Sequence, residues 1–511
     1  MKTNNCFISC LFIAFLALPV FSFGQDGSLD LTFGTAGTVT TSIVPANFEQ
    51  AYGMTVQADG KIILVGVSGG DFAVARYNTD GSPDNTFDSD GKLTTSIGPG
   101  SDAAIGVTVQ PDGKIVVVGG TIGVANDFAV LRYNADGSLD TSFDNDGIVV
   151  TDIDTKNDYA FAVALQADGK IVVAGHSAAA IGAKYNVAVA RYNTNGSLDN
   201  TFDADGKAIS NFGTDDSAHS LGLQSDGKIV VGGQSHDGTT LDLLVTRFNT
   251  DGSLDLTFDT DGRVTTTFAP SSFERGKSIV VQTDGKILLC GATTVSGNFD
   301  FALVRYNGNG SLDASFDGDG KLTTAFSALS DEGFGIAVLP NGKIVVAGTR
   351  INGSNTDICL ARYNTDGSMD TSFDSDGKVI TPGGTALEPA YTMALQSDGK
   401  ILTGGGFNMA NKNSFALRRF NNSLVAGISR LNINNPIIEI YPNPSNGKFN
   451  LLSEKPVLKL EIYDQIGKCV YTSTVPGTKY EINISALSKG VYICKISHES
   501  GQTTSGQIVI E

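Results

Sequence analysis

The sequence is poor in the residues that most often carry recognisable chemistry. It contains no tryptophan, four histidines and six cysteines among 511 residues. Cys6 and Cys10 fall in an N-terminal apolar segment, and the remaining cysteines, Cys290 and Cys359 among them, are scattered. They do not make a disulfide framework for a chain of this length. No CxxC pair and no Cys/His cluster indicates a zinc site.

Positive charge is also scarce. Lysine and arginine number 35 against 54 aspartates and glutamates, which gives a net charge of −19. This excess of negative charge argues against nucleic acid and against an anionic membrane surface as partners. Charged residues make up only 17% and hydrophobic residues 41%, so apolar material for a large core is ample. With 61 glycines, the composition predicts many short strands joined by tight turns.

After the first 24 residues, no stretch is long and apolar enough to span a bilayer. Residues 1–24 are typical of a secretory signal peptide, with Lys2 at the start, an apolar run, and Ser22-Phe23-Gly24 as a small-residue cleavage site. An uncleaved membrane anchor is the alternative, but Pro19 breaks the short apolar run. We therefore expect an exported protein with no transmembrane segment in its mature chain.

What the sequence has in quantity is repetition. Two short markers each recur seven times, and consecutive starts of the second are 53, 56, 58, 58, 57 and 57 residues apart. Such a period in a strand-rich chain indicates a propeller or a solenoid. The first marker, Arg-Tyr/Phe-Asn, begins at Arg76, Arg132, Arg191, Arg247, Arg305, Arg362 and Arg419. The second, Asp/Asn-Gly-Lys-Ile, begins at Asp59, Asp112, Asp168, Asp226, Asp284, Asn341 and Asp398.

One repeat unit predicts four strands, at 51–57, 61–66, 71–77 and 91–96. Four antiparallel strands make a propeller blade, and seven blades make a closed ring of ordinary size.

The two ends of the repeat region support a closed ring. Residues 37–42 read as an extra strand at the start, whereas the last unit loses its fourth strand after Asn421. We predict that the N-terminal strand completes the last blade, because closure removes the open sheet edges that invite aggregation. An open solenoid would not need such a complement.

Both markers, in register over about residues 26–421, make this region resemble the delta-60 repeat family of bacterial secreted proteins, a group assigned to β-propellers. The resemblance implies a seven-bladed β-propeller over residues 25–422. That family carries no settled activity, so the resemblance adds a fold and no chemistry.

Each unit also carries an aspartate-rich loop, which in residues 132–147 reads RYNADGSLDTSFDNDG. Asp140, Asp144 and Asp146 are weak candidates for calcium ligands. With Gly147 as the sixth position of an EF-hand-like loop, however, the twelfth position is an isoleucine where a bidentate glutamate belongs.

The copy at residues 30–37 has lost both later carboxylates. Aspartate and glycine also form such turns for backbone reasons alone. Near-identical, solvated loops around a ring would not give a catalytic pair with separated pKa values. We therefore expect these aspartates to form turns, with no metal and no cofactor, and the marker arginines to tie strand ends to neighbouring carboxylates or carbonyls.

Function is then expected in the segments that differ between copies. These join the second strand to the third and the fourth strand to the next blade, and they share one face, opposite the repeated loops. Their rings could stack on a carbohydrate or a peptide, but singly exposed apolar residues are also normal. No spacing places two of the histidines on one strand face for a metal. The residues in question are Phe48, Tyr159, Tyr185, Phe273, Phe299 and Tyr391, with His176, His219 and His236.

Enzyme motifs are absent from the sequence, which has no GxSxG, HExxH or P-loop pattern, so no catalytic residue is assigned. The leading hypothesis is an extracellular binding or adhesion scaffold with a glycan or protein ligand. A propeller can also assemble an active site from distant residues, so a secreted polysaccharide hydrolase or lyase on the variable loops is the alternative. A surface-layer component without a small ligand is a third possibility.

Composition changes near residue 423. Residues 423–434 read as a linker, and residues 435–511 alternate in short strands that predict a small Ig-like β-sandwich. This segment resembles the type A sorting domain of the type IX secretion system, although Glu511 replaces the usual basic terminal residue. The motif residues are Tyr441, Pro442, Asn443, Pro444, Asn446 and Gly447, then Gly467 and Lys468, then Gly490, Val491 and Tyr492.

The resemblance implies the type IX secretion machinery as a partner for residues 435–511. It also implies a final location either secreted or attached to the outer surface of the outer membrane.

Overall fold

The computed structural model describes the chain in strands, turns and loops. Its described part contains no helix, and therefore none long and apolar enough to cross a membrane. The predicted signal peptide and linker lie outside the described residues. These are 25–45, 47–122, 126–154, 157–180, 182–353, 355–382, 389–409, 412–422, 438–441, 445, 447–463, 468–488, 490–498 and 503–510.

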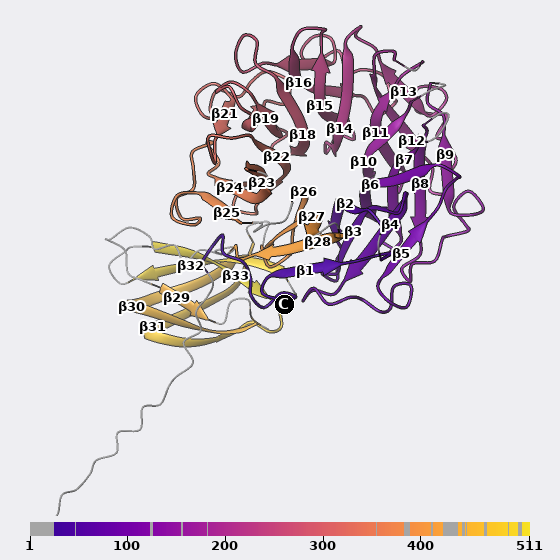
Figure 1. Ribbon diagram of the computed structural model, residues 1–511. Coiled ribbons are helices and arrows are strands. Elements are labelled where there is room, and N and C mark those ends of the chain that lie inside the picture. Colours follow the sequence, from indigo (N-terminus) through magenta and orange to yellow (C-terminus); the bar gives the residue numbers. More distant parts are fainter. Residues whose placement is uncertain are drawn as a thin grey trace, which may run out of the picture.

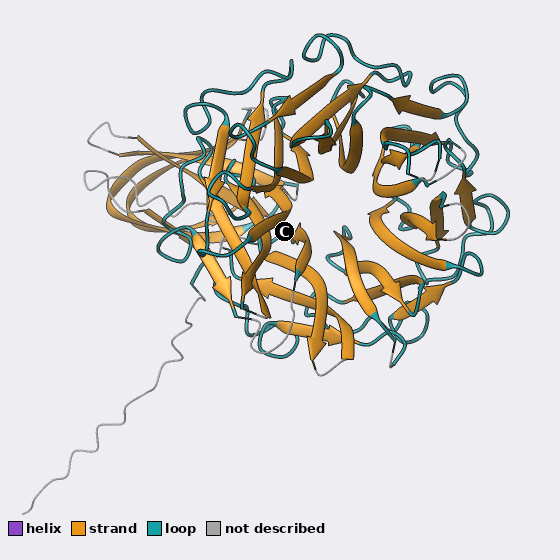
Figure 2. Cartoon of the chain, turned by 45° about the horizontal axis from the view of Figure 1, so that its top comes forward, coloured by secondary structure: helices purple, strands orange, loops and turns teal. Residues whose placement is uncertain are grey.

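Seven four-stranded antiparallel sheets stand around a common axis as the blades of a propeller (Figure 1, Figure 2). This confirms the predicted seven-bladed β-propeller. In the first six blades the strands follow chain order outward from the axis. The first three blades are β2 (Glu49–Val56), β3 (Ile62–Ser68), β4 (Asp71–Tyr77) and β5 (Lys92–Thr95); β6 (Ser101–Val109), β7 (Ile115–Ile122), β8 (Phe128–Tyr133) and β9 (Ile148–Thr151); and β10 (Tyr159–Leu165), β11 (Ile171–Ser177), β12 (Asn186–Tyr192) and β13 (Lys207–Ser210).

The next three blades repeat this order. They are β14 (Asp215–Leu223), β15 (Ile229–His236), β16 (Leu241–Phe248) and β17 (Arg263–Thr266); β18 (Glu274–Val281), β19 (Ile287–Thr293), β20 (Asp300–Tyr306) and β21 (Lys321–Thr324); and β22 (Asp331–Val338), β23 (Ile344–Asn352), β24 (Asn355–Tyr363) and β25 (Lys378–Thr381).

The seventh blade joins the two ends of the repeat region. It consists of β26 (Ala390–Leu395), β27 (Ile401–Met409), β28 (Lys412–Phe420) and, as its outer strand, β1 (Thr38–Thr41). β1 pairs antiparallel with β28, with Thr38 opposite Arg418. The predicted closure by the N-terminal strand is confirmed.

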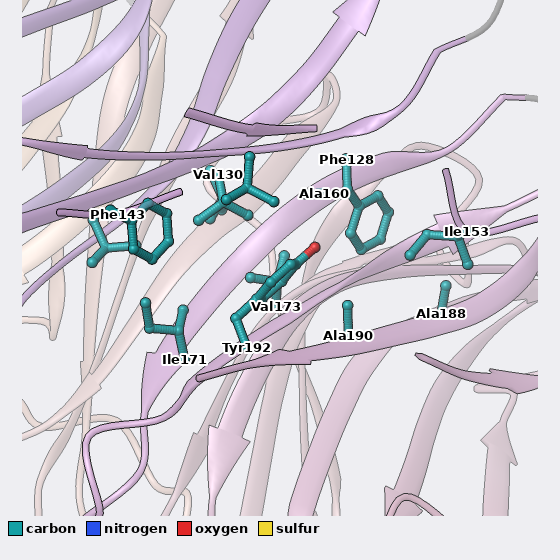
Figure 3. Packing of buried hydrophobic residues seen from close by; sticks show 13 residues of the cluster. Phe128, Val130, Phe143, Ile153, Ala160, Ile171, Val173, Ala188, Ala190 and Tyr192 are labelled. Atoms are coloured by element: carbon teal, nitrogen blue, oxygen red, sulfur yellow. The ribbon is translucent and has the colours of Figure 1, made fainter. Parts of the chain in front are cut away.

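Apolar runs explain why the middle strands of each blade form where they do. Every residue of β11 and β12 is buried, as expected of continuous apolar strands covered on both faces. Figure 3 shows the cluster that fills the junction between the second and third blades, with Phe128 and Ile153 at one end and Phe143 and Ile171 at the other. The core is thus a set of such clusters, one layer between each pair of blades.

The repeated loops lock neighbouring blades together on one face, which we call the repeated-loop face. Arg132 Nε donates to Asp140 Oδ2 at 2.7 Å, and Arg132 Nη1 donates to the Thr194 carbonyl of the next blade at 2.5 Å. The guanidinium also lies 4.5 Å from the ring centroid of Phe143. The same latch recurs as Arg76–Asp84, Arg191–Asp199, Arg247–Asp255, Arg305–Asp313, Arg362–Asp370 and Arg419–Asp30. This confirms the predicted role of the marker arginines.

The C-terminal region forms a separate antiparallel sheet with its own buried core. Its assignment as an Ig-like sandwich stays a prediction. The strands are β29 (Ile438–Tyr441), β30 (Lys448–Tyr463), β31 (Cys469–Asn483), β32 (Gly490–His498) and β33 (Thr503–Ile510).

The motif residues of this region lie at strand ends where they are described. Tyr441 ends β29, Gly447 precedes β30 with a φ of 84°, and Lys468 precedes β31. Gly490, Val491 and Tyr492 open β32. Pro442, Asn443, Pro444, Asn446 and Gly467 lie outside the described residues.

Candidate binding site in the axial channel

A β-bulge recurs at the same place in the innermost strand of every blade. In β2 the pairing with β3 shifts between Ala51 and Gly53, so Tyr52 is the extra residue. A bulge re-aims a side chain, and here the seven extra residues all line one cavity of about 490 Å³ on the propeller axis. We call them the bulge ring: Tyr52, Ile105, Phe161, His219, Lys277, Phe334 and Tyr391.

Small residues beside each bulge allow the innermost strands to approach one another. A Cβ on Gly53 would lie 2.3 Å from the Ile105 carbonyl oxygen of the next blade, a distance that real Cβ atoms do not adopt. The bulge residue is therefore flanked by small neighbours in each blade, while the bulge position itself is free to vary.

Several members of the bulge ring touch one another. The rings of Tyr52 and Tyr391 have centroids 5.9 Å apart, and Phe334 meets Tyr391 edge-on at 5.2 Å. On another arc, Phe161 and His219 lie 5.0 Å apart. All are only partly buried, so the channel presents aromatic surface rather than a sealed core.

A histidine cluster lies beside this ring. Ser217 Oγ is 2.7 Å from His176 Nδ1 and 3.2 Å from His219 Nε2. Burial lowers the pKa of His176 to about 4. Burial, with lesser effects of Lys277 and His176, lowers that of His219 to about 3. Both imidazoles are therefore neutral near pH 7, and the hydroxyl can accept a hydrogen bond from one and donate to the other.

Tyrosines enclose the histidine cluster. The ring of Tyr185 lies 4.1 Å from that of His176, and Tyr159 approaches His176 at 5.6 Å. Tyr159 begins β10 and pairs with His176 of β11. The cluster therefore joins the innermost strands of two blades to a loop of the variable face.

Charged groups occupy the next arc of the channel. Arg275 Nη1 lies 3.6 Å from Glu332 Oε2, and Lys277 Nζ lies 3.5 Å from Glu332 Oε1. The Arg275 guanidinium stacks 4.2 Å from the centroid of Phe299. These ion pairs are longer than hydrogen bonds, so two cations share one carboxylate and retain capacity for an anionic or hydroxyl group.

The sequence-based expectation for these residues was partly wrong. Tyr159, Tyr391, His176, His219 and His236 lie in strands rather than loops. His176 and His219, which share no strand, converge because β11, the second strand of the third blade, packs against β14, the innermost strand of the fourth. Phe48, Tyr185, Phe273 and Phe299 do lie in connections between strands.

A sequence signal for the bulge ring exists. Each ring residue stands seven positions before the Asp/Asn-Gly-Lys marker, in the middle of a small–variable–small triplet such as Ala51-Tyr52-Gly53. Periodicity fixes that register, but only the bulge turns the middle residue toward the axis.

The aspartates of the repeated loop lie on the opposite face and do not converge. Asp140 is buried, which corrects the expectation of a solvated setting, because Arg132 and Lys114 cover it. Burial acts to raise its pKa, but hydrogen bonds from Lys114 and Ser142 and the charge of Arg132 hold that pKa well below its usual range.

The other two loop aspartates act on the backbone. Asp144 has a φ of 48° and its N–H donates to the Asn195 carbonyl of the next blade. Asp146 Oδ1 accepts from the Ile148 N–H at 2.9 Å. These contacts are those of turn-forming residues.

Comparison with known families covers both parts of the chain. Residues 57–87, 110–143, 166–202, 224–258, 282–316, 339–373 and 396–432 match the family described as a domain of unknown function (DUF5122) β-propeller. Residues 439–511 match the family described as a secretion system C-terminal sorting domain. No curated protein has a matching sequence.

Solved structures align with the chain at low identity and low TM-score. PorZ, described as a surface component of the type-IX secretion system of Porphyromonas gingivalis, aligns at 12% identity with a TM-score of 0.35, over 90% of this chain and 59% of PorZ. A PL25 ulvan lyase aligns at 13% identity and a TM-score of 0.43, over 76% of this chain and 94% of the lyase. The polysaccharide lyase Uly1 aligns at 12% identity with the same TM-score, over 79% and 94%. At these identities and TM-scores the likeness supports no conclusion about this chain.

Proposed function

We propose that this chain, which carries seven DUF5122 β-propeller repeats and a secretion system C-terminal sorting domain, binds a saccharide outside the cell at its axial channel. The sorting domain directs the protein to secretion or to the outer surface of the cell. The propeller is then the part that meets an extracellular ligand.

The bulge ring is the observation that carries this proposal. Tyr52, Phe334 and Tyr391 offer a partly exposed aromatic arc around a cavity of about 490 Å³. Aromatic faces give apolar contact at low cost in conformational entropy, and a few polar groups at their edges set orientation. Arg275 and Glu332 supply such groups beside the arc.

A glycan array probed with the mature protein tests the proposal. Tyr391→Ala should weaken binding to any hit by roughly tenfold or more, as expected for a ring at the centre of an interface. Leu256→Ala is the matched control, because Leu256 is 65% exposed in a repeated loop of the opposite face. Equal binding by both variants would place the ligand outside the channel, and a protein ligand without glycan hits would replace the saccharide.

The histidine cluster supports a second candidate, a polysaccharide hydrolase or lyase. A serine hydroxyl between two neutral imidazoles can pass a proton in either direction. Ser217→Ala should then abolish turnover of an array hit while leaving its binding intact. Absence of turnover by the wild-type protein on every bound glycan would exclude this candidate.

The export role has a separate test in cells. Deletion of residues 435–511 should leave the propeller folded but retained in the periplasm. Truncated protein at the cell surface in normal amount would contradict the assignment.

A further inference from the structure

Three carboxylates converge at the variable face of the junction between the second and third blades. Asp127 precedes β8, Asp152 follows β9 and Asp158 precedes β10. One carboxylate oxygen from each lies within 4.8 Å of the others. Among the described residues, no other group of three or more aspartate, glutamate, histidine or cysteine side chains has its ligand atoms this close together.

Asp158 is fixed in this group by the backbone around it. Its Oδ2 accepts from the Ile153 N–H at 2.7 Å and from the Asp154 N–H at 3.3 Å. Its own N–H donates to the Asn126 carbonyl at 2.7 Å. Beneath these residues, Phe128 and Ile153 close the apolar end of the cluster in Figure 3. The carboxylate therefore cannot swing out to solvent.

The second oxygen of Asp158 accepts no hydrogen bond of standard geometry. The residue is 0% exposed, and Asp158 Oδ1 has only the Ser177 hydroxyl beside it, which itself makes no hydrogen bond of standard geometry among the described residues. A buried acceptor without a partner is costly. No lysine or arginine of the described chain forms an ion pair with Asp127 or Asp158.

The equivalent junctions of other blades carry two acidic residues rather than three. Asp71 with Asp102, Asp242 with Glu274 and Asp300 with Asp331 correspond to Asp127 with Asp158. At the position of Asp152, however, these junctions carry Ser96, Thr267 and Ala325. The third carboxylate is thus a departure from the repeat, which the fold itself does not require.

We propose that Asp127, Asp152 and Asp158 bind a hard divalent cation, with calcium as the expected ion. Carboxylate oxygens are the ligands that calcium prefers, and its flexible coordination tolerates ligands drawn from three separate segments. The ion ligates the buried oxygen of Asp158 that lacks a hydrogen bond of standard geometry, and it offsets the repulsion that Asp152 exerts on Asp127 and Asp158. It also braces the junction beside Tyr159, at the edge of the histidine cluster. This proposal is independent of the saccharide site.

Calorimetric titration of the mature protein with calcium chloride, after treatment with chelator, tests the site. One site per chain is expected. Terbium should bind competitively with calcium and luminesce through energy transfer from Tyr159, because the sequence has no tryptophan. Magnesium is titrated in parallel, and binding of magnesium with no binding of calcium would overturn the assignment of the ion.

Two variants replace a carboxylate of the site by the residue found at the equivalent position of another blade junction. Asp152→Ser reproduces Ser96, and Asp127→Asn reproduces Asn186 of the third blade. Each should weaken calcium binding at least tenfold while the far-ultraviolet circular dichroism stays that of the wild-type protein, since Asp152 is exposed and Asp127 only partly buried. Ser96→Ala is the control and should bind calcium as the wild-type protein does. Absence of calcium binding to the wild-type protein at millimolar concentration, or unchanged binding by Asp152→Ser, would overturn the proposal.

Discussion

At the repeated-loop face the aspartate that pairs with each marker arginine also faces a lysine, whereas at the variable face buried carboxylates face one another. Lys61 and Arg76 lie 3.1 and 2.7 Å from Asp84. Burial acts to raise the pKa of Asp84, but hydrogen bonds from Thr86 and Lys61 and the charge of Arg76 lower it to about 2. For Asp102, burial and the nearby Asp71 raise the pKa despite two backbone hydrogen bonds. Aspartate is thus stabilised in its charged form at the repeated-loop face, whereas its charged form is disfavoured at the variable face.

The difference also appears in hydrogen bonding. At the repeated-loop face, Asp140 uses both oxygens, with Ser142 on one and Arg132 with Lys114 on the other. The buried carboxylate oxygens without a hydrogen-bond partner, among the described residues, lie toward the variable face. They are Glu49 Oε2, Asp102 Oδ1, Asp158 Oδ1, Asp242 Oδ1 and Glu274 Oε2. Glu332 Oε1 also lacks a hydrogen bond, but it lies 3.5 Å from Lys277 Nζ. Proteins concentrate such local energetic costs at functional sites. The repeated-loop face, whose buried carboxylates are fully hydrogen-bonded, therefore stabilises the ring. The variable face, whose buried carboxylates are not, is where ligands should be sought.

The largest expected effect comes from removing the N-terminal segment, which supplies the arginine–aspartate pair of the seventh blade, Arg419 with Asp30. Deletion of residues 25–43 takes away β1, the buried Phe33 and Asp30, the carboxylate partner of Arg419. Loss of the phenylalanine costs about 1.5–3 kcal/mol, and an unpaired buried arginine costs about 3–5 kcal/mol. Urea denaturation should therefore show a loss of roughly 5 kcal/mol or more. A denaturation curve that matches the wild-type curve would contradict the role of this segment.

Two single substitutions contrast the faces directly. Asp140→Asn leaves the buried Arg132 without its counter-charge and should cost about 3 kcal/mol. Asp102→Asn removes a charge that its surroundings disfavour and should cost at most about 1 kcal/mol at pH 7. Chemical denaturation of both variants measures the difference. Equal losses would mean that the two faces do not treat their carboxylates differently.

The histidine cluster gives the variable face its own pH dependence. Because burial lowers the pKa of His176 to about 4, the folded protein keeps this imidazole neutral while the unfolded chain takes up a proton near pH 6.5. Stability should therefore fall as the pH drops from about 6.5 to 4, by on the order of 2 kcal/mol.

Burial also lowers the pKa of His219, so His176→Gln should reduce this slope and the double variant His176→Gln/His219→Gln should flatten it. Denaturation at several pH values measures both variants. His236→Gln, outside the histidine cluster, is the control and should keep the wild-type slope. A slope that persists unchanged in the double variant would assign the pH dependence to groups outside the histidine cluster.

The smallest effect is expected in the repeated loop itself. We propose that Asp144 and Asp146 are turn formers that bind no calcium. Asparagine also adopts the positive φ that Asp144 has. The double substitution to asparagine should therefore change stability by less than about 0.5 kcal/mol. For this double variant, the melting temperatures in calcium and in chelator should differ by as much as they do for the wild-type protein. The variant Asp152→Ser should remove that difference. Loss of the calcium response in the double variant would return the metal site to the repeated loop.

Sequence reasoning succeeded where a contact repeats. The seven-fold spacing of two markers predicted the blades, and the missing last strand predicted that residues 37–42 would fill the seventh blade beside β28. The tie between the marker arginines and nearby carboxylates was also predictable, because Arg132 and Asp140 stand eight residues apart in one hairpin. These contacts could be predicted because their residues are close in sequence and because each contact recurs in every repeat.

The candidate sites were not predictable in the same way. His176 and Ser217 are 41 residues apart and come from different blades. Asp127 and Asp158 are likewise brought together only by the packing of the second blade against the third. Nothing in the periodicity states that a bulge turns Tyr52 and its counterparts toward the axis.

The sequence by itself determined the architecture, because strand propensity and turn residues act locally and recur in register, and it indicated the export by sorting motifs that are contiguous in the C-terminal region. Only the tertiary structure decided which variable residues meet. Closing the ring places the innermost strand of every blade around a common axis, so side chains separated by whole repeats come within a few ångströms of each other. Those meetings depend on blade-to-blade packing, which no single repeat contains.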